Sequence, residues 1–296
     1  MAFDPYSILP PFGWLFVAIA AVSLHWLLAK NLITKKVNDT AISFLNPLLS
    51  TLFFIPAVFL LGADFGFSGG NWLQWQNPGF AIAIISGLIW AASMLFNYKS
   101  LKHIDVSDSM VISQARIIFV LFISWTLLSE ILTIEKLFAA FLIFAGTALC
   151  SYKYHKLKLQ FSGVLYAVFG AAFSAAAYVL DKMAIAHVPI LIFAIASSIP
   201  VMLGIFLWDR TALQNAKKAV LAFPKEFLAF GILLAISYTS LLLALNMLEA
   251  SVAVPIYGTR VVLISLGGIL LLREKTQWIL KILGAILAFA GVVLIS

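Results

Sequence analysis

Charged residues are scarce in this chain, and their scarcity indicates its class. Of 296 residues only 10% are Asp, Glu, Lys or Arg, and 63% are hydrophobic. A soluble domain carries about 25% charged residues. Apolar runs of about 20 residues recur along the whole chain, which is the length an α-helix needs to cross the hydrocarbon of a bilayer. The sequence therefore predicts an all-α integral membrane protein in contact with the lipid bilayer, with no separate soluble domain.

Other absences narrow the function. Cys150 is the only cysteine, which excludes an internal disulfide and a cysteine-based metal cluster. The sequence has no Walker loop, nucleophile elbow or metal-binding motif. We therefore expect no enzyme, no ATP-driven transport by this chain alone, no catalytic or metal-ligating residue and no cofactor. Because the Lys and Arg residues behind the formal charge of +7 are dispersed, we expect no nucleic-acid partner.

The apolar runs predict ten transmembrane helices. The N-terminal segment MAFDPYSILPP lacks the basic region and cleavage site of a signal peptide, so we expect the first run to be a retained span. The predicted spans are 12–33, 41–62, 79–98, 107–128, 135–152, 162–183, 189–208, 226–246, 251–272 and 277–295.

Two breaks between the predicted spans are long. The first, ADFGFSGGNWLQWQNP, carries Trp72 and Trp75 and is typical of a loop that rests at the membrane interface. The second, DRTALQNAKKAVLAFPK, places apolar residues beside Lys217 and Lys218. It predicts either a short interfacial helix or an ordinary solvated loop.

The chain contains an internal repeat. Arg116 and Arg260 are separated by 260 − 116 = 144 residues, and Glu130 and Glu274 by 274 − 130 = 144. We expect two halves, 1–152 and 153–296, with five spans each. Because five is odd, the second half enters the membrane from the opposite side, which makes two inverted five-helix repeats.

Loop charges predict the orientation. Cytoplasmic loops carry an excess of Lys and Arg. The loops after the odd-numbered spans carry Lys35, Lys36, Lys99, Lys102, Lys153, Lys156, Lys158, Arg210, Lys217, Lys218, Lys225, Arg273 and Lys275. The opposite side has little beyond Lys136 and Lys182. We expect a multi-pass protein of the plasma (inner) membrane with both termini facing outward.

Two related segments, LLSEILTIEKLFAAFLIFAGTAL and LLLREKTQWILKILGAILAFAGVVL, close the two halves. With ten spans in two repeats, they make the chain resemble the EamA family of the drug/metabolite transporter superfamily over essentially its whole length. The family typically has Gly-Glu where this chain has Ser129 and Arg273 before the glutamates. The resemblance implies a transporter; members export amino acids, drugs and other metabolites, and related branches carry phosphorylated solutes.

The chain departs from the family at one informative position. Fourteen residues before the turn glutamate many members have Glu-Pro, whereas this chain has Arg116-Ile117 and Arg260-Val261, since 130 − 116 = 14 and 274 − 260 = 14. The charge at an expected cavity position is thereby reversed. This departure argues against a cationic cargo.

Arg116 and Arg260 are the leading candidates for binding the cargo. An arginine at the centre of a membrane costs about 2.5–3.5 kcal/mol on insertion scales and usually marks a functional site. A guanidinium group offers a rigid fork of donors for a carboxylate or phosphate. The alternative is structural: each arginine caps helix carbonyls, snorkels, or contacts an acid such as Asp108 or Asp181. The sequence places every acid in a loop or at the end of a span.

Other candidates lie near the arginines or in the first span. Gln114, Ser113, Tyr257 and Thr259 are within one turn of an arginine and can contact the cargo or bond neighbouring helices. His25 can bind cargo or titrate, or simply be hydrogen-bonded inside the bundle. The aromatic residues Trp26, Trp90, Tyr178 and Tyr238 can form a wall or pack against lipid. Of these, Trp26 and Tyr178 occupy matching places, in SLHWLLAK and AAAYVLDK.

The sequence therefore predicts a secondary transporter, a monomer or homodimer, that moves a small organic anion. The cargo class is a carboxylate, amino-acid-like or phosphorylated metabolite. Transport is expected to be facilitated diffusion or exchange, or proton-linked only through His25. Glu130 and Glu274 are expected to start the helices that follow them. The alternatives are a broad exporter of aromatic or cationic drugs and a non-transporting sensor or assembly subunit.

Overall fold

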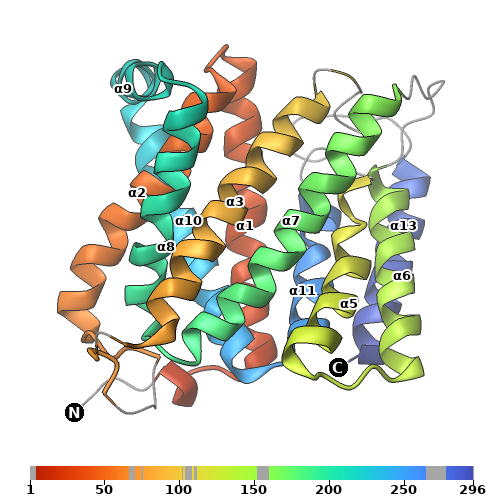
Figure 1. Ribbon diagram of the computed structural model, residues 1–296. Coiled ribbons are helices and arrows are strands. Elements are labelled where there is room, and N and C mark those ends of the chain that lie inside the picture. The colour runs from red at the N-terminus through yellow and green to blue at the C-terminus, as the bar shows by residue number, and fades with distance from the viewer. Residues whose placement is uncertain are drawn as a thin grey trace. The chain divides into compact units, whose positions relative to one another are not determined.

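The structure is a computed structural model, and it describes residues 5–66, 71–74, 76–101, 103, 109, 112–151, 160–264 and 278–295. Every regular element in these ranges is a helix (Figure 1). The helices are η1 (Pro5–Ser7), α1 (Pro11–Thr34), α2 (Asp39–Leu61), α3 (Pro78–Leu101), α5 (Arg116–Leu128), α6 (Ile134–Ser151), α7 (Phe161–Ile185), α8 (Ile190–Trp208), α9 (Ala212–Ala222), α10 (Pro224–Met247), α11 (Ala250–Gly258) and α13 (Trp278–Ile295). The all-α prediction is confirmed for these ranges.

Six of the described helices are long and apolar enough to cross a membrane. They are Pro11–Ile33, Thr40–Leu61, Pro78–Asn97, Phe161–Ile185, Ile190–Trp208 and Pro224–Met247. Shorter apolar helices cover Arg116–Leu128, Ala250–Ile264 and Ile279–Ile295. The chain is thus an all-helical membrane protein, and the count of ten spans stays a prediction.

The chain forms two compact units. Unit 1 comprises Met1–Ala91 and Leu180–Leu248, and unit 2 comprises Ala92–Val179 and Glu249–Ser296. Each unit takes residues from both predicted repeats. The compact units are therefore not the sequence halves, and the division of the sequence at residue 152 remains a prediction about the repeat.

Unit 1 is held together by close helix packing. Helix α1 packs against α10, and α2 packs against both α8 and α10. The Ser237 hydroxyl on α10 donates to the Ala18 carbonyl on α1 over 3.0 Å. A Cβ atom at Gly87 would lie 2.3 Å from the Ser197 carbonyl oxygen, so only glycine lets α3 approach α8 this closely. Small residues allow such contacts in membrane bundles.

The second long break contains a helix, which is one of the two alternatives predicted for it. Helix α9 buries Ala212, Ala216 and Ala219 and packs against α2. Its Lys217 and Lys218 are exposed. Figure 1 shows α9 nearly end-on, across the direction of α2 and α8. This amphipathic pattern is typical of a helix at the membrane interface.

The first long break is only partly described. The Trp72 indole donates a hydrogen bond to the Asp64 carboxylate within this break. Trp75, the second tryptophan of the predicted interfacial loop, lies outside the described residues, as does Glu274.

Unit 2 is built on the pairing of α6 with α13, which lie side by side in Figure 1. A Cβ atom at Gly146 would lie 2.4 Å from the Ala288 backbone nitrogen, and one at Gly284 would lie 2.5 Å from the Gly146 carbonyl oxygen. The buried Cys150 thiol donates to the Lys281 carbonyl over 3.2 Å. The two final segments thus pack backbone against backbone.

Candidate functional site

The predicted span 107–128 is interrupted immediately before Arg116. Helix α5 begins at Arg116, and residues 114 and 115 form a turn. The Ala115 amide donates to the Ile112 carbonyl over 2.9 Å, and the Ile117 amide donates to the Gln114 carbonyl over 2.9 Å. These bonds join residues three apart rather than four, the tighter pattern of a 3₁₀ turn. The expectation of one uninterrupted helix over 107–128 is therefore wrong.

The second half has a matching break before Arg260. Helix α11 ends at Gly258, and Thr259 forms a turn. Pro255 lies within α11 and has no amide hydrogen to continue the helical bonds. The Thr259 hydroxyl instead donates to the Ile256 carbonyl over 2.6 Å. Because 259 − 115 = 144, the breaks occupy equivalent places in the repeat.

Paired helix breaks give the site its chemistry. A broken helix leaves backbone N–H and C=O groups without helical partners. In many secondary transporters such discontinuous helices form the substrate site near the bilayer midplane. Arg116 and Arg260 each follow their break directly, so both cations lie where the regular helix is interrupted. The bonds between residues three apart satisfy backbone groups at these breaks.

Arg116 has few partners. Its Nη2 donates to the Gln114 side-chain oxygen over 3.3 Å, and its buried Nε has no hydrogen-bond partner. Within the described part of the chain, Arg116 makes no ion pair. Leaving a buried donor without an acceptor costs about 1–3 kcal/mol, and more for a charged group. A bound group that supplies an acceptor to Arg116 therefore removes this free-energy cost.

Arg260 is more enclosed, with 8% of its surface exposed. Its Nη1 donates to the Tyr257 carbonyl over 3.4 Å, and its guanidinium carbon lies 4.2 Å from the centre of the Tyr257 ring. The first contact is the carbonyl capping predicted as the structural alternative. Since a guanidinium carries five N–H donors, capping and anion binding are compatible.

Five of the predicted binding residues come together in unit 2. Arg116 lies within electrostatic range of Arg260, Tyr178 and Tyr257. The rings of Tyr178 and Tyr257 are 6.2 Å apart in a T-shaped arrangement. With Gln114, these residues place two like charges among neutral polar groups. Two adjacent cations repel each other in a medium of low dielectric constant, and an anion relieves that repulsion.

His25 and Trp26 belong to unit 1, and the contacts of His25 there are those of a residue packed inside a helix bundle. His25 is buried, with its Nδ1 3.4 Å from the Phe230 carbonyl oxygen and its ring centre 4.0 Å from that of Phe230. Trp26 is 42% exposed. A satisfied histidine inside the bundle was one of the two predicted readings, and the cargo-binding role of both residues remains a prediction.

The sequence named Asp181 only as an alternative contact of the arginines, but it is the most enclosed acid in the described chain. Asp181 lies inside α7 with 0% of its surface exposed. It accepts hydrogen bonds from Ser86, Trp90 and Tyr238. The expectation put Asp181 at the end of a span, which is where it lies in α7, and did not address its burial. Its position four residues before the end of an apolar helix was the available signal.

Glu130 starts a helix, but not the one expected. Its carboxylate accepts hydrogen bonds from the Ala250 amide at 2.7 Å and the Ser251 amide at 2.9 Å, at the N-terminus of α11. The neighbouring Lys136 forms an ion pair with Glu249. The turn between α5 and α6 therefore fastens the start of the broken helix α11, whose far end leads to Arg260.

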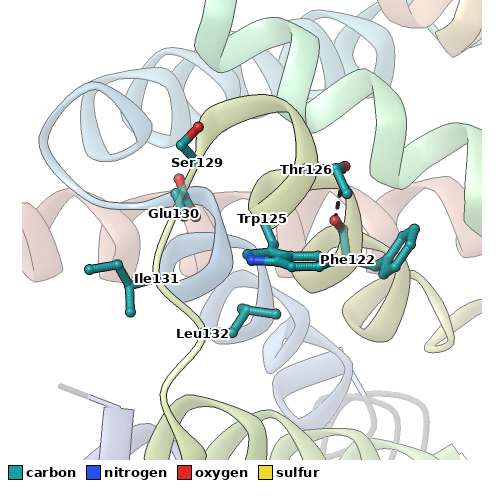
Figure 2. Close-up of a pocket in the computed structure, with 7 residues that line it drawn as sticks. All are labelled: Phe122, Trp125, Thr126, Ser129, Glu130, Ile131 and Leu132. Atoms are coloured by element: carbon teal, nitrogen blue, oxygen red, sulfur yellow. Dashed lines mark hydrogen bonds between the residues drawn. The ribbon is translucent and has the colours of Figure 1, made fainter.

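An open hollow of about 880 Å³ lies beside this turn. Its lining residues are Phe122, Trp125, Thr126, Ser129, Glu130, Ile131 and Leu132. Figure 2 shows the Phe122 and Trp125 side chains on one face of the end of α5. Trp125 is 52% exposed and Ile131 is 73% exposed, the pattern of a lipid-facing surface. The hollow does not include any of the predicted binding residues.

Comparison with known proteins identifies the family. The EamA-like transporter family matches residues 11–152 and 161–296. The chain belongs to the EamA-like transporter family. No curated protein matches it. Among the 29 matching chains of solved structures, one crystal structure has 16% sequence identity and a TM-score of 0.73, and the alignment covers 97% of this chain and 96% of that one. That likeness shows the fold alone.

Family membership agrees with two predictions from the sequence. This EamA-like transporter is a multi-pass membrane protein and not an enzyme. Transport implies a small-molecule substrate and a lipid bilayer as its surroundings. The family name alone does not indicate the cargo. The class of cargo therefore has to be inferred from Arg116 and Arg260.

Proposed function

We propose that this EamA-like protein is a secondary transporter for a small organic anion and that Arg116 and Arg260 bind the anionic group. The supporting observation is the buried Arg116 Nε without a hydrogen-bond partner, in electrostatic range of a second arginine. A carboxylate or phosphate supplies several acceptor oxygens at once. It also reduces the repulsion between the guanidinium groups.

The neighbours of the arginines limit the kind of cargo. Tyr178 is 4% exposed and Tyr257 is 6% exposed, so the cations are bordered by aromatic surface. Gln114 adds an amide. A small carboxylate, an amino-acid-like solute or a phosphorylated metabolite with an apolar portion fits this chemistry.

Transport by alternating access follows from the predicted repeat. Two inverted five-helix halves, 1–152 and 153–296, expose a central site to each side of the plasma membrane in turn. The matching helix breaks before Arg116 and Arg260 support this symmetry. Thirteen basic residues in the odd-numbered loops, counted from the sequence, support outward-facing termini.

Exchange in proteoliposomes tests the proposal. Vesicles are loaded with unlabelled glutamate, succinate or glycerol phosphate, and uptake of the same labelled solute is measured. Wild type is expected to exchange at least one anion. Arg116→Ala should lower that exchange roughly 10- to 150-fold, because a hydrogen bond to a charged group contributes about 1.5–3 kcal/mol. Arg116→Lys keeps the charge but not the fork and should be intermediate.

A matched control separates the site from the general effect of losing an arginine. Arg210 is exposed beyond the end of α8, with its guanidinium 5.0 Å from the Phe206 ring. Arg210→Ala should leave exchange unchanged. Exchange restricted to neutral or cationic solutes, or full activity in Arg116→Ala, would contradict anion binding by the arginines.

A further inference from the structure

Four side chains in unit 1 form a separate polar centre, which we call the Asp181 cluster: Asp181, Ser86, Trp90 and Tyr238. The Ser86 hydroxyl donates to Oδ1 of Asp181. The Trp90 indole and the Tyr238 hydroxyl both donate to Oδ2, each over 3.1 Å. Two helices, α3 and α10, thus direct three donors at one completely buried carboxyl group on α7.

The donors of the Asp181 cluster come from two helices and converge on this one carboxyl group. Ser86 and Trp90 are four residues apart on α3, so they lie on one face of that helix. Tyr238 approaches from α10. Asp181 itself sits within an apolar segment, AAAYVLDKMAI, where an acid is costly and usually functional.

Among the residues that the structure describes, no cation contacts Asp181. The adjacent Lys182 donates its ammonium group to the Leu248 carbonyl. Helix α8 has no titratable side chain. On α7, Tyr178 lies one turn earlier, and its ring contacts the Tyr257 ring.

The remaining ionisable groups of the neighbouring helices are distant along those helices. On α3, Lys99 is nine residues beyond Trp90. On α10, Lys225 and Glu226 are thirteen and twelve residues before Tyr238. On α1, which packs against α10, His25 contacts the Phe230 carbonyl, two helical turns before Tyr238. In the described ranges, only neutral dipoles therefore stabilise the ionised form of Asp181, and no permanent cation there fixes its charge.

The cluster suits a proton better than a metal cation. An indole N–H can donate but cannot accept, so Trp90 opposes a metal ion beside Oδ2. Hard cations require six or more oxygen ligands, whereas this cluster offers one carboxyl group and two hydroxyls. In the described part of the chain, no group of three or more His, Cys, Asp or Glu residues is placed to hold a metal.

Both protonation states of Asp181 find partners. The ionised form accepts three hydrogen bonds. When Oδ1 carries a proton, it can donate to the Ser86 oxygen, because a hydroxyl accepts as well as donates. Trp90 and Tyr238 continue to donate to Oδ2. A change of charge then requires the rotation of one hydroxyl and no movement of a helix.

We propose that Asp181 is a proton-binding site of this transporter and that its protonation is coupled to transport. The coupling part of this proposal rests on the proposed transport function. It does not depend on whether the cargo carries a negative or a positive charge. It replaces the expectation that any proton linkage runs through His25. The proton bound at Asp181 comes from water on one side of the membrane and is released on the other.

Infrared titration of purified protein in liposomes tests proton binding without any cargo. Wild type should show a carboxyl C=O band that disappears as the pH rises. Asp181→Asn should lack the band, and Asp209→Asn should retain it because Asp209 is partly exposed and bonded to Thr40 and Thr211. The absence of an Asp181-dependent band at any pH would overturn the proposal.

Charge displacement tests the coupling. A pH step applied to proteoliposomes on a solid-supported membrane should give a transient current in wild type and in His25→Ala. The current should fall more than tenfold in Asp181→Asn. Equal currents in wild type and Asp181→Asn, or loss in His25→Ala alone, would overturn the proposal. Anion exchange measured without a pH gradient should survive Asp181→Asn, which separates this result from a failure of the arginine site.

Two further variants apply if Asp181→Asn does not fold. Ser86→Ala and Tyr238→Phe each remove one donor and leave the carboxyl group in place. Donors favour the ionised form, so the band should titrate at higher pH in both variants. An unchanged titration in both would overturn the proposal.

Discussion

Arg116 and Arg260 each follow directly after a break in a helix, at positions 144 residues apart. At both breaks an amide donates to the carbonyl three residues earlier, Ala115 to Ile112 and Thr259 to Ile256, which is the tighter pattern of a 3₁₀ turn. The repeat therefore duplicates a local geometry as well as a charge.

The Glu130 carboxylate supports the second of these breaks from a distance. Glu130→Ala removes two hydrogen bonds to the start of α11, and each such bond to a charged group contributes about 1.5–3 kcal/mol. We expect thermal unfolding in detergent at a temperature several degrees lower, and weaker anion exchange because α11 leads to Arg260.

Glu135 offers the matched control for Glu130. It is exposed in the first turn of α6, where a carboxylate contributes about 0.3–1 kcal/mol through the helix dipole. Glu135→Ala should therefore change the unfolding temperature little. If both variants unfold at the same temperature, Glu130 does not stabilise α11.

The contact between α6 and α13 depends on Gly146. In Gly146→Ala the new Cβ atom would lie 2.4 Å from the Ala288 nitrogen and 2.5 Å from the Gly284 oxygen. Backbone atoms cannot yield without moving a helix, so we expect destabilisation of about 1–3 kcal/mol, measured by unfolding in detergent. Gly13→Ala meets only side-chain atoms, at 3.3 Å, and should be neutral or stabilising. Equal stability of wild type and Gly146→Ala would refute this packing role.

The buried Cys150 makes orientation measurable. Because Cys150 is the only cysteine and is 2% exposed, a membrane-impermeant maleimide should not label wild type. Gln214→Cys, on α9, should be labelled only from the cytoplasm, and Gln74→Cys, in the loop after α2, only from outside. Both glutamines are exposed. The opposite pattern would reverse the predicted orientation and place the termini inside.

Composition and periodicity were sufficient to predict the helical membrane class, and the family resemblance was confirmed. The repeat spacing singled out Arg116 and Arg260 as a pair, and their role in binding the cargo stays a prediction. The break before Arg116 was missed because Ser113 to Ala115 contains no proline or glycine, and tertiary packing overrides local preference there. The break before Arg260 had signals, Pro255 and Gly258, that were not interpreted as a break. The structure describes only part of the first long break, and Glu274 lies outside the described residues, so the prediction for Glu274 is not tested.

The Asp181 cluster illustrates a different limit of sequence reasoning. Trp90 and Tyr238 were considered as an aromatic wall, and Asp181 as a partner for an arginine. Their actual relationship joins residues as far apart as Ser86 and Tyr238, which no local pattern reveals. Only the fold shows that three donors face one carboxyl group.

The most direct measurement of anion binding is a thermal-shift assay with probes of different charge. Purified protein is mixed with glutamate, succinate or inorganic phosphate as anions, with succinamide as a neutral solute, or with tetramethylammonium as a cation. Wild type and Arg210→Ala should be stabilised by at least one anion and not by the other probes. Arg116→Ala should lose that stabilisation. Stabilisation by the cation alone, or an anion effect that persists in Arg116→Ala, would contradict the account.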